Sequence, residues 1–207
     1  MKVLVVSDVH ANIAALNTIL EKEADYDILC CAGDYTDYGI HPAEVIERFR
    51  NLKNTHLVYG NHDLHVINTY ESGEWRTVED GKYKWVHYNC ERLNDQDIAW
   101  LKQLPETAYF EADGWKYGIA HQYDNGYGII ESRYAFDKYW AEHYGTDNVG
   151  NRRLIFGHTH RQCIHILGDG MEWLNPGSAS YRRPDDPDKT AHYAICTAFM
   201  ALGLMLP

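Results

Sequence analysis

Long apolar runs are scarce in this 207-residue sequence, and none is long enough to cross a membrane. The longest, Ala194 to Leu206, contains Thr197 and Gly203 and falls well short of the roughly 20 apolar residues that a transmembrane helix requires. It predicts a buried strand. The first apolar run, Val3 to Val6, is too short for the apolar region of a signal peptide. We therefore expect a cytoplasmic protein with no membrane partner.

Positive charge is also scarce. The chain has 19 Lys and Arg against 30 Asp and Glu, which gives a formal net charge of −11. Proteins that neutralise nucleic-acid phosphates usually carry a basic surface, so binding to duplex nucleic acid is disfavoured and a nuclease is a poor fit. A small phosphorylated substrate is still compatible, because bound cations can outweigh the surrounding carboxylates.

The cysteines do not form the even set that a disulfide framework needs, because there are five of them. A free thiol inside an apolar run behaves as a small hydrophobe, and no cysteine stands beside a motif that could carry chemistry. The thiols therefore predict a reducing, cytoplasmic setting and no part in a mechanism. The cysteines within apolar runs are Cys30, Cys31, Cys163 and Cys196.

The first third of the chain alternates strands with helices. Val3–Val6 predicts a short strand, and apolar residues at helical spacing follow it behind Asn12, a candidate helix cap. The unit recurs with a strand at Ile28–Ala32, a helix opened by Pro42, and a strand at His56–Tyr59. Strands that alternate with helices favour parallel pairing.

Closely spaced strand signals follow a predicted helix that Asn94 caps and Pro105 ends. We expect one α/β domain over residues 1–207, with two mixed β-sheets packed as a sandwich and flanking helices. Two segments rich in Tyr and Trp, 64–94 and 122–150, fit this pattern poorly and predict helical or irregular excursions. The later strands are expected at Thr107–Glu111, Lys116–His121, Arg153–Phe156, Cys163–Leu167, Met171–Leu174 and His192–Phe199.

Polar motifs follow five of these strands at the point where each ends. In open α/β sheets, ligands bind outside the carboxyl ends of the strands. The donors are carboxylate, carboxamide and imidazole without thiolate, a set that suits Mn, Fe, Zn, Co or Ni. The motifs are Asp8-x-His10, Gly33-Asp34, Gly60-Asn61-His62-Asp63, His121 and Gly157-His158-Thr159-His160.

Two of the motifs pair residues that are two positions apart. In an extended strand, Asp8 and His10 would point to one side, as would His158 and His160, and each pair could hold one ion. Taken alone, an Asp-x-His after a strand is usually a turn or a helix cap, and histidines are common in polar loops. The joint occurrence of all the motifs, each after an apolar strand, predicts a dinuclear metal site.

This ordered set resembles the motif series of the calcineurin-like metallophosphoesterases, and the match spans nearly the whole chain. The later run Asn175-Pro176-Gly177-Ser178 resembles the small bacterial and archaeal phosphodiesterase branch of that family. The resemblance implies a dinuclear metal-dependent hydrolase of phosphoesters, either a phosphodiesterase or a phosphatase. Its substrate would be small, for example a nucleotide, and a hydroxide bridging the two metal ions would attack phosphorus.

The resemblance also implies a ligand set with Asp34 shared between two divalent ions. Mn²⁺ is the expected metal, with Fe, Zn, Ni or Co as alternatives. Asp8, His10, Asp34 and His160 would hold one ion, and Asp34, Asn61, His121 and His158 the other.

His62 is not part of this ligand set. Its position between Asn61 and Asp63 suggests a general acid that protonates the leaving oxygen, with Asp63 orienting its ring. The alternative is an exposed loop histidine without a role.

One departure from the family pattern concerns Tyr38. It stands in Tyr35-Thr36-Asp37-Tyr38-Gly39, where the Ser/Thr protein phosphatase branch has Asp-Arg-Gly. Because a tyrosine cannot offer the bidentate cationic contact of arginine to phosphate, protein phosphatase activity is doubtful. Arg182 could substitute in part, although its sequence context is also typical of a surface residue in a polar turn.

Two further alternatives follow from the same residues. The fold can serve as a protein-binding scaffold once its site has degenerated, but the intact His62 favours an enzyme. The aromatic residues of the two excursions could stack on a nucleobase or aryl group, or could pack a small subdomain instead.

Overall fold

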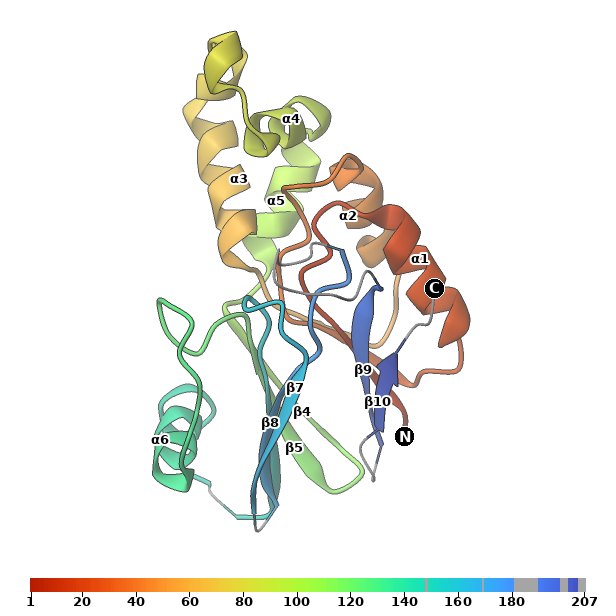
Figure 1. The fold of residues 1–207 in the computed structure, drawn as a ribbon, viewed down its shortest axis with the longest axis vertical. Helices are drawn as coiled ribbons and strands as arrows, with labels where there is room; N and C mark the ends of the chain where they lie inside the picture. The colour runs from red at the N-terminus through yellow and green to blue at the C-terminus, as the bar shows by residue number, and fades with distance from the viewer. Residues whose placement is uncertain (148, 169, 181–189, 198–200, 205–207) are drawn as a thin grey trace.

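The computed structural model describes residues 1–147, 149–168, 170–180, 190–197 and 201–204, which form two mixed five-stranded sheets with helices outside them (Figure 1). This confirms the predicted fold class. The first sheet has the order β10-β9-β1-β2-β3 and the second the order β4-β5-β6-β8-β7. The first contains β1 (Val3–Val6), β2 (Ile28–Cys31), β3 (Thr55–Leu57), β9 (His192–Cys196) and β10 (Ala201–Leu204). The second contains β4 (Thr107–Ala112), β5 (Trp115–Ala120), β6 (Asn151–Ile155), β7 (Cys163–Gly168) and β8 (Met171–Asn175).

Strand direction follows the predicted alternation. The strands β1, β2 and β3 pair in parallel, whereas β9 is antiparallel to β1. In the second sheet β5, β6 and β8 are parallel, and β4 and β7 are antiparallel edges. The carboxyl ends of β1, β2, β3, β5 and β6 therefore lie where helices and loops can bring their polar motifs together.

The alternation of side chains along β1 divides the core into layers. Val3 and Val5 pack between the two sheets, whereas Leu4 and Val6 face the helices on the other side of the first sheet. All four are buried, as expected for a strand covered on both faces.

Helices cover the outer faces of both sheets (Figure 1). The helices α1 (Ile13–Lys22) and α2 (Pro42–Arg50) pack on the first sheet, and α6 (Arg133–His143) packs on the second. The predicted caps are present, since the Asn12 side chain accepts a hydrogen bond from the Ala15 amide and Asn94 caps α5 (Asp95–Gln103). Among the described residues, no helix has the length and apolar character needed to span a bilayer.

The segment 64–94 is mostly helical. It contains most of α3 (Asn61–Ser72), two short 3₁₀ turns at Glu74–Arg76 and Asp80–Lys82, and α4 (Trp85–Arg92). The other excursion, 122–150, contains α6 and a loop at 122–130.

The expectation of one C-terminal strand is wrong. The strand β9 ends at Cys196, and β10 folds back to pair antiparallel with it. The expected extension to Phe199 ends in residues outside the described part of the chain. An apolar run is compatible with two consecutive strands, because it carries no information on where the chain reverses.

Candidate metal centre

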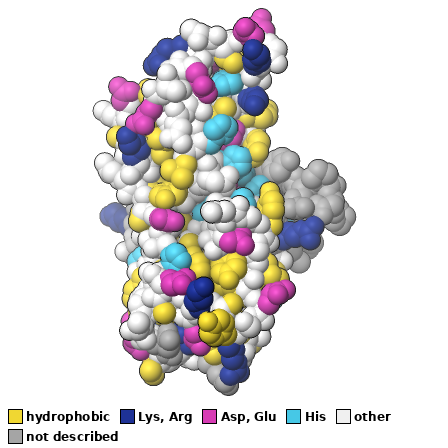
Figure 2. All heavy atoms as spheres, turned by 90° about the vertical axis from the view of Figure 1, so that its left-hand side faces the viewer, with side chains coloured by type: hydrophobic (Ala, Val, Ile, Leu, Met, Phe, Trp, Pro, Cys, Tyr) yellow, Lys and Arg dark blue, Asp and Glu magenta, His cyan; other side chains and the backbone are white. Residues whose placement is uncertain are grey.

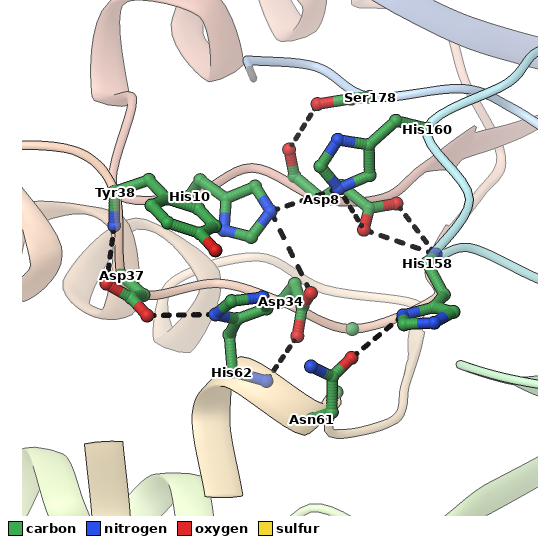
Figure 3. A network of polar contacts seen from close by, with 12 residues as sticks. Asp8, His10, Asp34, Asp37, Tyr38, Asn61, His62, His158, His160 and Ser178 are labelled. Carbon is green, nitrogen blue, oxygen red and sulfur yellow. Dashed lines mark hydrogen bonds and ion pairs between the residues drawn. The ribbon is translucent and has the colours of Figure 1, made fainter. Parts of the chain in front are cut away.

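The expected ligands come together at one end of the two sheets, on the loops that follow β1, β2, β5 and β6 and on the first turn of α3. Figure 3 labels all of them except His121. Histidine side chains lie in a row that runs down this face of the molecule from its upper part to its middle (Figure 2). The Asp34 carboxylate lies close against the backbone of Gly60, because a Cβ at Gly60 would lie 2.1 Å from Asp34 Oδ1. Only glycine leaves room for this carboxylate.

The first group consists of Asp8, His10, Asp34 and His160. Their candidate ligand atoms all lie within 4.8 Å of one another. His160 Nε2 is 3.1 Å from Asp8 Oδ1 and 3.3 Å from His10 Nε2, and His10 Nε2 is 3.8 Å from Asp34 Oδ2. The members expected to hold one ion therefore converge.

The second group consists of Asp34, Asn61, His121 and His158. Asn61 Oδ1 lies 2.9 Å from His121 Nε2 and 3.0 Å from His158 Nδ1. His121 Nε2 lies 3.3 Å from Asp34 Oδ2. Asp34 thus faces both groups.

The donor atoms fit divalent cations. Asp34 Oδ2 is buried and has no hydrogen bond from the described residues. His10 Nδ1 donates to the Thr36 carbonyl at 3.0 Å, and His121 Nδ1 donates to the Ala32 carbonyl at 2.6 Å. Each backbone contact fixes the ring so that Nε2 points into the cluster, and in a neutral imidazole this nitrogen is free to bind a metal ion.

Electrostatics keep the two buried carboxyls ionised. Burial raises the pKa of Asp34, but the facing rings of His121, His10 and His62 lower it more, so its pKa lies well below the usual range. Burial likewise raises the pKa of Asp8, but the hydrogen bond from His160 and the nearby rings of His160 and His121 together lower it more. Two buried carboxylates among histidines are an arrangement that cations stabilise.

The route by which these side chains meet differs from the expected strand geometry. Asp8 and His10 have φ angles of 54° and 45°, so the chain has left the extended conformation. His158 and His160 point to different groups, since His158 faces Asn61 and His160 faces Asp8. The expectation that this pair points to one side is therefore wrong.

The ring of His62 contacts Asp37, and the expectation that Asp63 orients it is wrong. His62 Nδ1 lies 2.8 Å from Asp37 Oδ2. His62 and Asp63 are consecutive residues of the first turn of α3, where neighbouring side chains do not face each other. Burial lowers the pKa of His62, but the hydrogen bond with Asp37 and nearby carboxylates raise it more, so its net shift is upward.

Asp63 has a structural role instead. Its buried carboxylate accepts hydrogen bonds from the amides of Asp34, Tyr35, Thr36 and Gly60 and from the Thr36 hydroxyl. These bonds fix the loop that presents Asp34, so Asp63 acts on the centre through the backbone.

No role was predicted from the sequence for three residues near His62. Asp37 is buried, and its amide donates to the Asn89 side chain at 3.0 Å. His65 Nδ1 lies 3.7 Å from Asp37 Oδ2. In the sequence, only Asp37 was indicated, because it lies in the segment that corresponds to Asp-Arg-Gly of the protein phosphatase branch. Nothing in the sequence indicated Asn89 or His65.

Tyr38 lies beside the centre, with its ring centroid 5.0 Å from that of His10 and 4.7 Å from that of His62. Ser178 Oγ donates to the Asp8 carbonyl at 2.9 Å, and Asn175 Nδ2 donates to Thr159 Oγ1 at 3.1 Å. The Asn-Pro-Gly-Ser run thus supports two ligand loops. Arg182 lies outside the described residues.

The fold and the centre define an α/β protein with carboxylate, amide and imidazole donors grouped as for two divalent cations. Residues 1–198 match the calcineurin-like phosphoesterase superfamily domain, and the chain belongs to this family of divalent-metal-dependent phosphoesterases.

Three similar proteins illustrate the family. An uncharacterized protein of Methanocaldococcus jannaschii is 28% identical over 210 residues, covering 93% of this chain and 81% of that protein. A symmetrical bis(5'-nucleosyl)-tetraphosphatase of Buchnera aphidicola is 30% identical over 111 residues, covering 51% of this chain and 38% of that protein. The crystal structure of a metallophosphoesterase from Sphaerobacter thermophilus is similar with a TM-score of 0.67 and 24% identity, covering 95% of this chain and 84% of that one.

Proposed function

We propose that this protein hydrolyses small phosphoesters, as a phosphodiesterase or phosphatase, with two divalent ions that share Asp34. The observation that carries the proposal is the buried Asp34 carboxylate, which faces both donor groups and leaves Oδ2 without a hydrogen bond from the described residues. When bound, two such ions supply Lewis-acid stabilisation of the phosphoryl oxygens and lower the pKa of water. We propose Mn²⁺ as the working metal.

The residues around the ions have separate tasks in this proposal. Asp8, His10 and His160 hold one ion with Asp34, and Asn61, His121 and His158 hold the other with it. His62 lies outside both groups. Its Nδ1 is held by Asp37, so Nε2 is the nitrogen that can donate a proton. It donates a proton to the leaving oxygen, and Asp37 keeps the ring in the orientation that this requires.

A nucleotide is the favoured substrate class. The tetraphosphatase among the relatives acts on a nucleotide compound by its name, which supports this choice. Tyr38, in the place of a phosphate-binding arginine, favours small substrates over phosphoproteins. All five cysteines are free thiols, which supports the proposed cytoplasmic setting.

Hydrolysis of bis-(p-nitrophenyl) phosphate tests this function. We expect turnover that requires added Mn²⁺, is abolished by a chelator and is restored by fresh Mn²⁺. Asp34→Asn should lose it, whereas Glu111→Gln, an exposed residue of β4, should keep it. A protein that binds Mn²⁺ without metal-dependent turnover of this diester or of any nucleotide ester would instead be the scaffold alternative.

A further inference from the structure

A cavity of about 240 Å³ adjoins the metal centre on the side of Asn61 and His121. It is bounded by the start of α3, the segment before β4, the loop after β5 and one face of α6. At roughly 30 Å³ per water molecule, it has room for about eight waters, which is enough for one small organic group.

The walls of this cavity combine aromatic surface with negative charge. Tyr139 is buried and packs between Tyr123 and His143, at centroid distances of 5.5 and 4.1 Å. Glu106 and Asp124 are exposed at the cavity, and the described residues that line it include no Lys or Arg. Carboxylates only accept hydrogen bonds, so the cavity favours neutral or cationic donors and repels a phosphate group.

The position of the cavity relative to His62 decides which part of a diester it can hold. The cavity is lined by the ligands Asn61 and His121, whereas His62 is outside its described lining and lies beside His10, with centroids 5.1 Å apart. Because the proposed acid must touch the leaving oxygen, the leaving group lies toward His62. The group next to Asn61 and His121 is then the one that stays on phosphorus.

We propose that this cavity binds the retained alcohol of a phosphodiester, and that this alcohol is small, carries no negative charge and donates hydrogen bonds to Glu106 and Asp124. The inference rests on the proposed function. In the reaction, a bond forms between water oxygen and phosphorus, the bond from phosphorus to the leaving oxygen breaks, and that oxygen gains a proton. The retained ester bond is untouched. Nucleosides and amino alcohols share the required chemistry.

Three p-nitrophenyl diesters with one leaving group test the cavity in the Mn²⁺ protein at low ionic strength. They are thymidine 5′-(p-nitrophenyl phosphate), its 3′-phosphorylated counterpart and p-nitrophenyl phosphoethanolamine. Each exposed charge interaction is worth up to about fivefold, so we expect kcat/KM to be about tenfold lower for the 3′-phosphorylated diester than for its neutral match. The preferred source is a nucleoside if kcat/KM is higher for the thymidine diester than for the ethanolamine diester, and an amino alcohol if the order is reversed.

In a double variant, Glu106→Gln with Asp124→Asn, the difference in kcat/KM between the neutral and 3′-phosphorylated diesters should fall to about twofold. The carboxylate of Asp124 accepts the amides of Gly126 and Gly128 at 2.8 and 3.2 Å, and a carboxamide oxygen in its place can still accept them, so the loop is preserved. Glu111→Gln, outside the cavity lining, should keep the full gap. Equal kcat/KM for both diesters in the unmodified protein, or an unchanged gap in the double variant, would overturn the cavity assignment. Failure to hydrolyse bis-(p-nitrophenyl) phosphate or any nucleotide ester with Mn²⁺ would instead overturn the proposed function.

Discussion

Backbone strain is concentrated at the residues of the metal centre. Of ten non-glycine residues with positive φ in the described chain, eight lie in the loops that build it. Such conformations cost of order 1 kcal/mol each and persist only where their surroundings fix them. The backbone conformation that places the candidate ligands therefore lowers the local stability of these loops. The eight are Asp8, His10, Ala11, Asp34, Asp37, Tyr38, His158 and His160.

Asp34 should matter to both ions and His10 to one. Asp34→Asn removes the charge that both donor groups share, so we expect it to lower the bound metal at both positions. His10→Ala should chiefly lower one, because His10 contacts only the first group. Elemental analysis of the purified variants measures this, and equal metal loss in the two would remove the argument for a shared Asp34.

His62 should reveal its role through the leaving group. An alkoxide needs a proton as it departs, whereas a nitrophenolate hardly does. His62→Asn should keep both metals and lose roughly 10² to 10⁴ in rate on a ribosyl or alkyl ester, but much less on a p-nitrophenyl ester. Asp37→Asn should show the same pattern more weakly, and Asp63→Asn should lower thermal stability instead. Equal losses on both esters with the metals intact would mean that His62 stabilises charge on the phosphoryl group.

The sequence predicted which residues meet better than it predicted how they contact. All seven expected ligands converge, because strand ends locate them whatever the loop conformation. The predicted partner of His62, Asp63, was wrong. Asp63 was treated as part of a loop, but it lies in a helix, where adjacent side chains point in different directions. Asp37 approaches His62 only through the fold, across 25 positions in the chain.

At the scale of elements, α4 connects the excursion 64–94 to the centre. Asn89, buried on α4, accepts the Asp37 amide at 3.0 Å and donates to the Gly39 carbonyl at 3.2 Å. This helix thus fixes the loop that carries Asp37 and Tyr38. An aromatic-rich sequence pattern could not indicate this, because the contact depends on one buried amide.

Asn89→Ala should therefore affect catalysis at a distance. We expect about a tenfold lower rate on a ribosyl ester, a smaller loss on a p-nitrophenyl ester, and unchanged metal content, since only the Asp37 loop is released. The lost buried hydrogen bonds should also lower the unfolding free energy by about 1 to 3 kcal/mol. Glu91→Gln, an exposed change on the same helix, is the matched control. If the two esters lost rate in equal proportion, the link through Asp37 would be refuted.

Most elements were predictable because their signals are local. Periodicity of two or 3.6 and the caps Asn12 and Asn94 located strands and helices to within a few residues. Two boundaries were predicted wrongly, because no local sequence pattern marks them. The helix α3 begins at Asn61, inside the motif, and the apolar C-terminal run reverses direction between β9 and β10.

At the scale of the whole molecule, Glu23 joins distant parts of the chain. Its carboxylate contacts Lys2 Nζ at 2.8 Å and accepts the Tyr193 hydroxyl at 2.5 Å, which ties the end of α1 to β9 and to the residue before β1. Burial raises the pKa of Glu23, but these two partners lower it more, so its net shift is downward.

This shift predicts how stability depends on pH. A carboxyl with a lowered folded-state pKa stabilises the protein above its unfolded-state pKa, roughly 4.3 for Glu, and loses this effect as pH falls through the folded-state value. Glu23→Gln should therefore lower the unfolding free energy by about 1 kcal/mol near neutral pH and by progressively less below roughly pH 4.3. Glu21→Gln, an exposed neighbour, is the control. A deficit in Glu23→Gln that stays constant with pH in denaturant titrations would contradict this account.

The central claim is that two divalent ions share Asp34, and anomalous diffraction from crystals of the Mn²⁺-loaded protein tests it most directly. We expect two manganese peaks roughly 3.5 to 4 Å apart, one on each side of the Asp34 carboxylate. One should lie against Asp8, His10 and His160, and the other against Asn61, His121 and His158. A single peak, or two peaks that leave Asp34 without a metal contact, would contradict the claim.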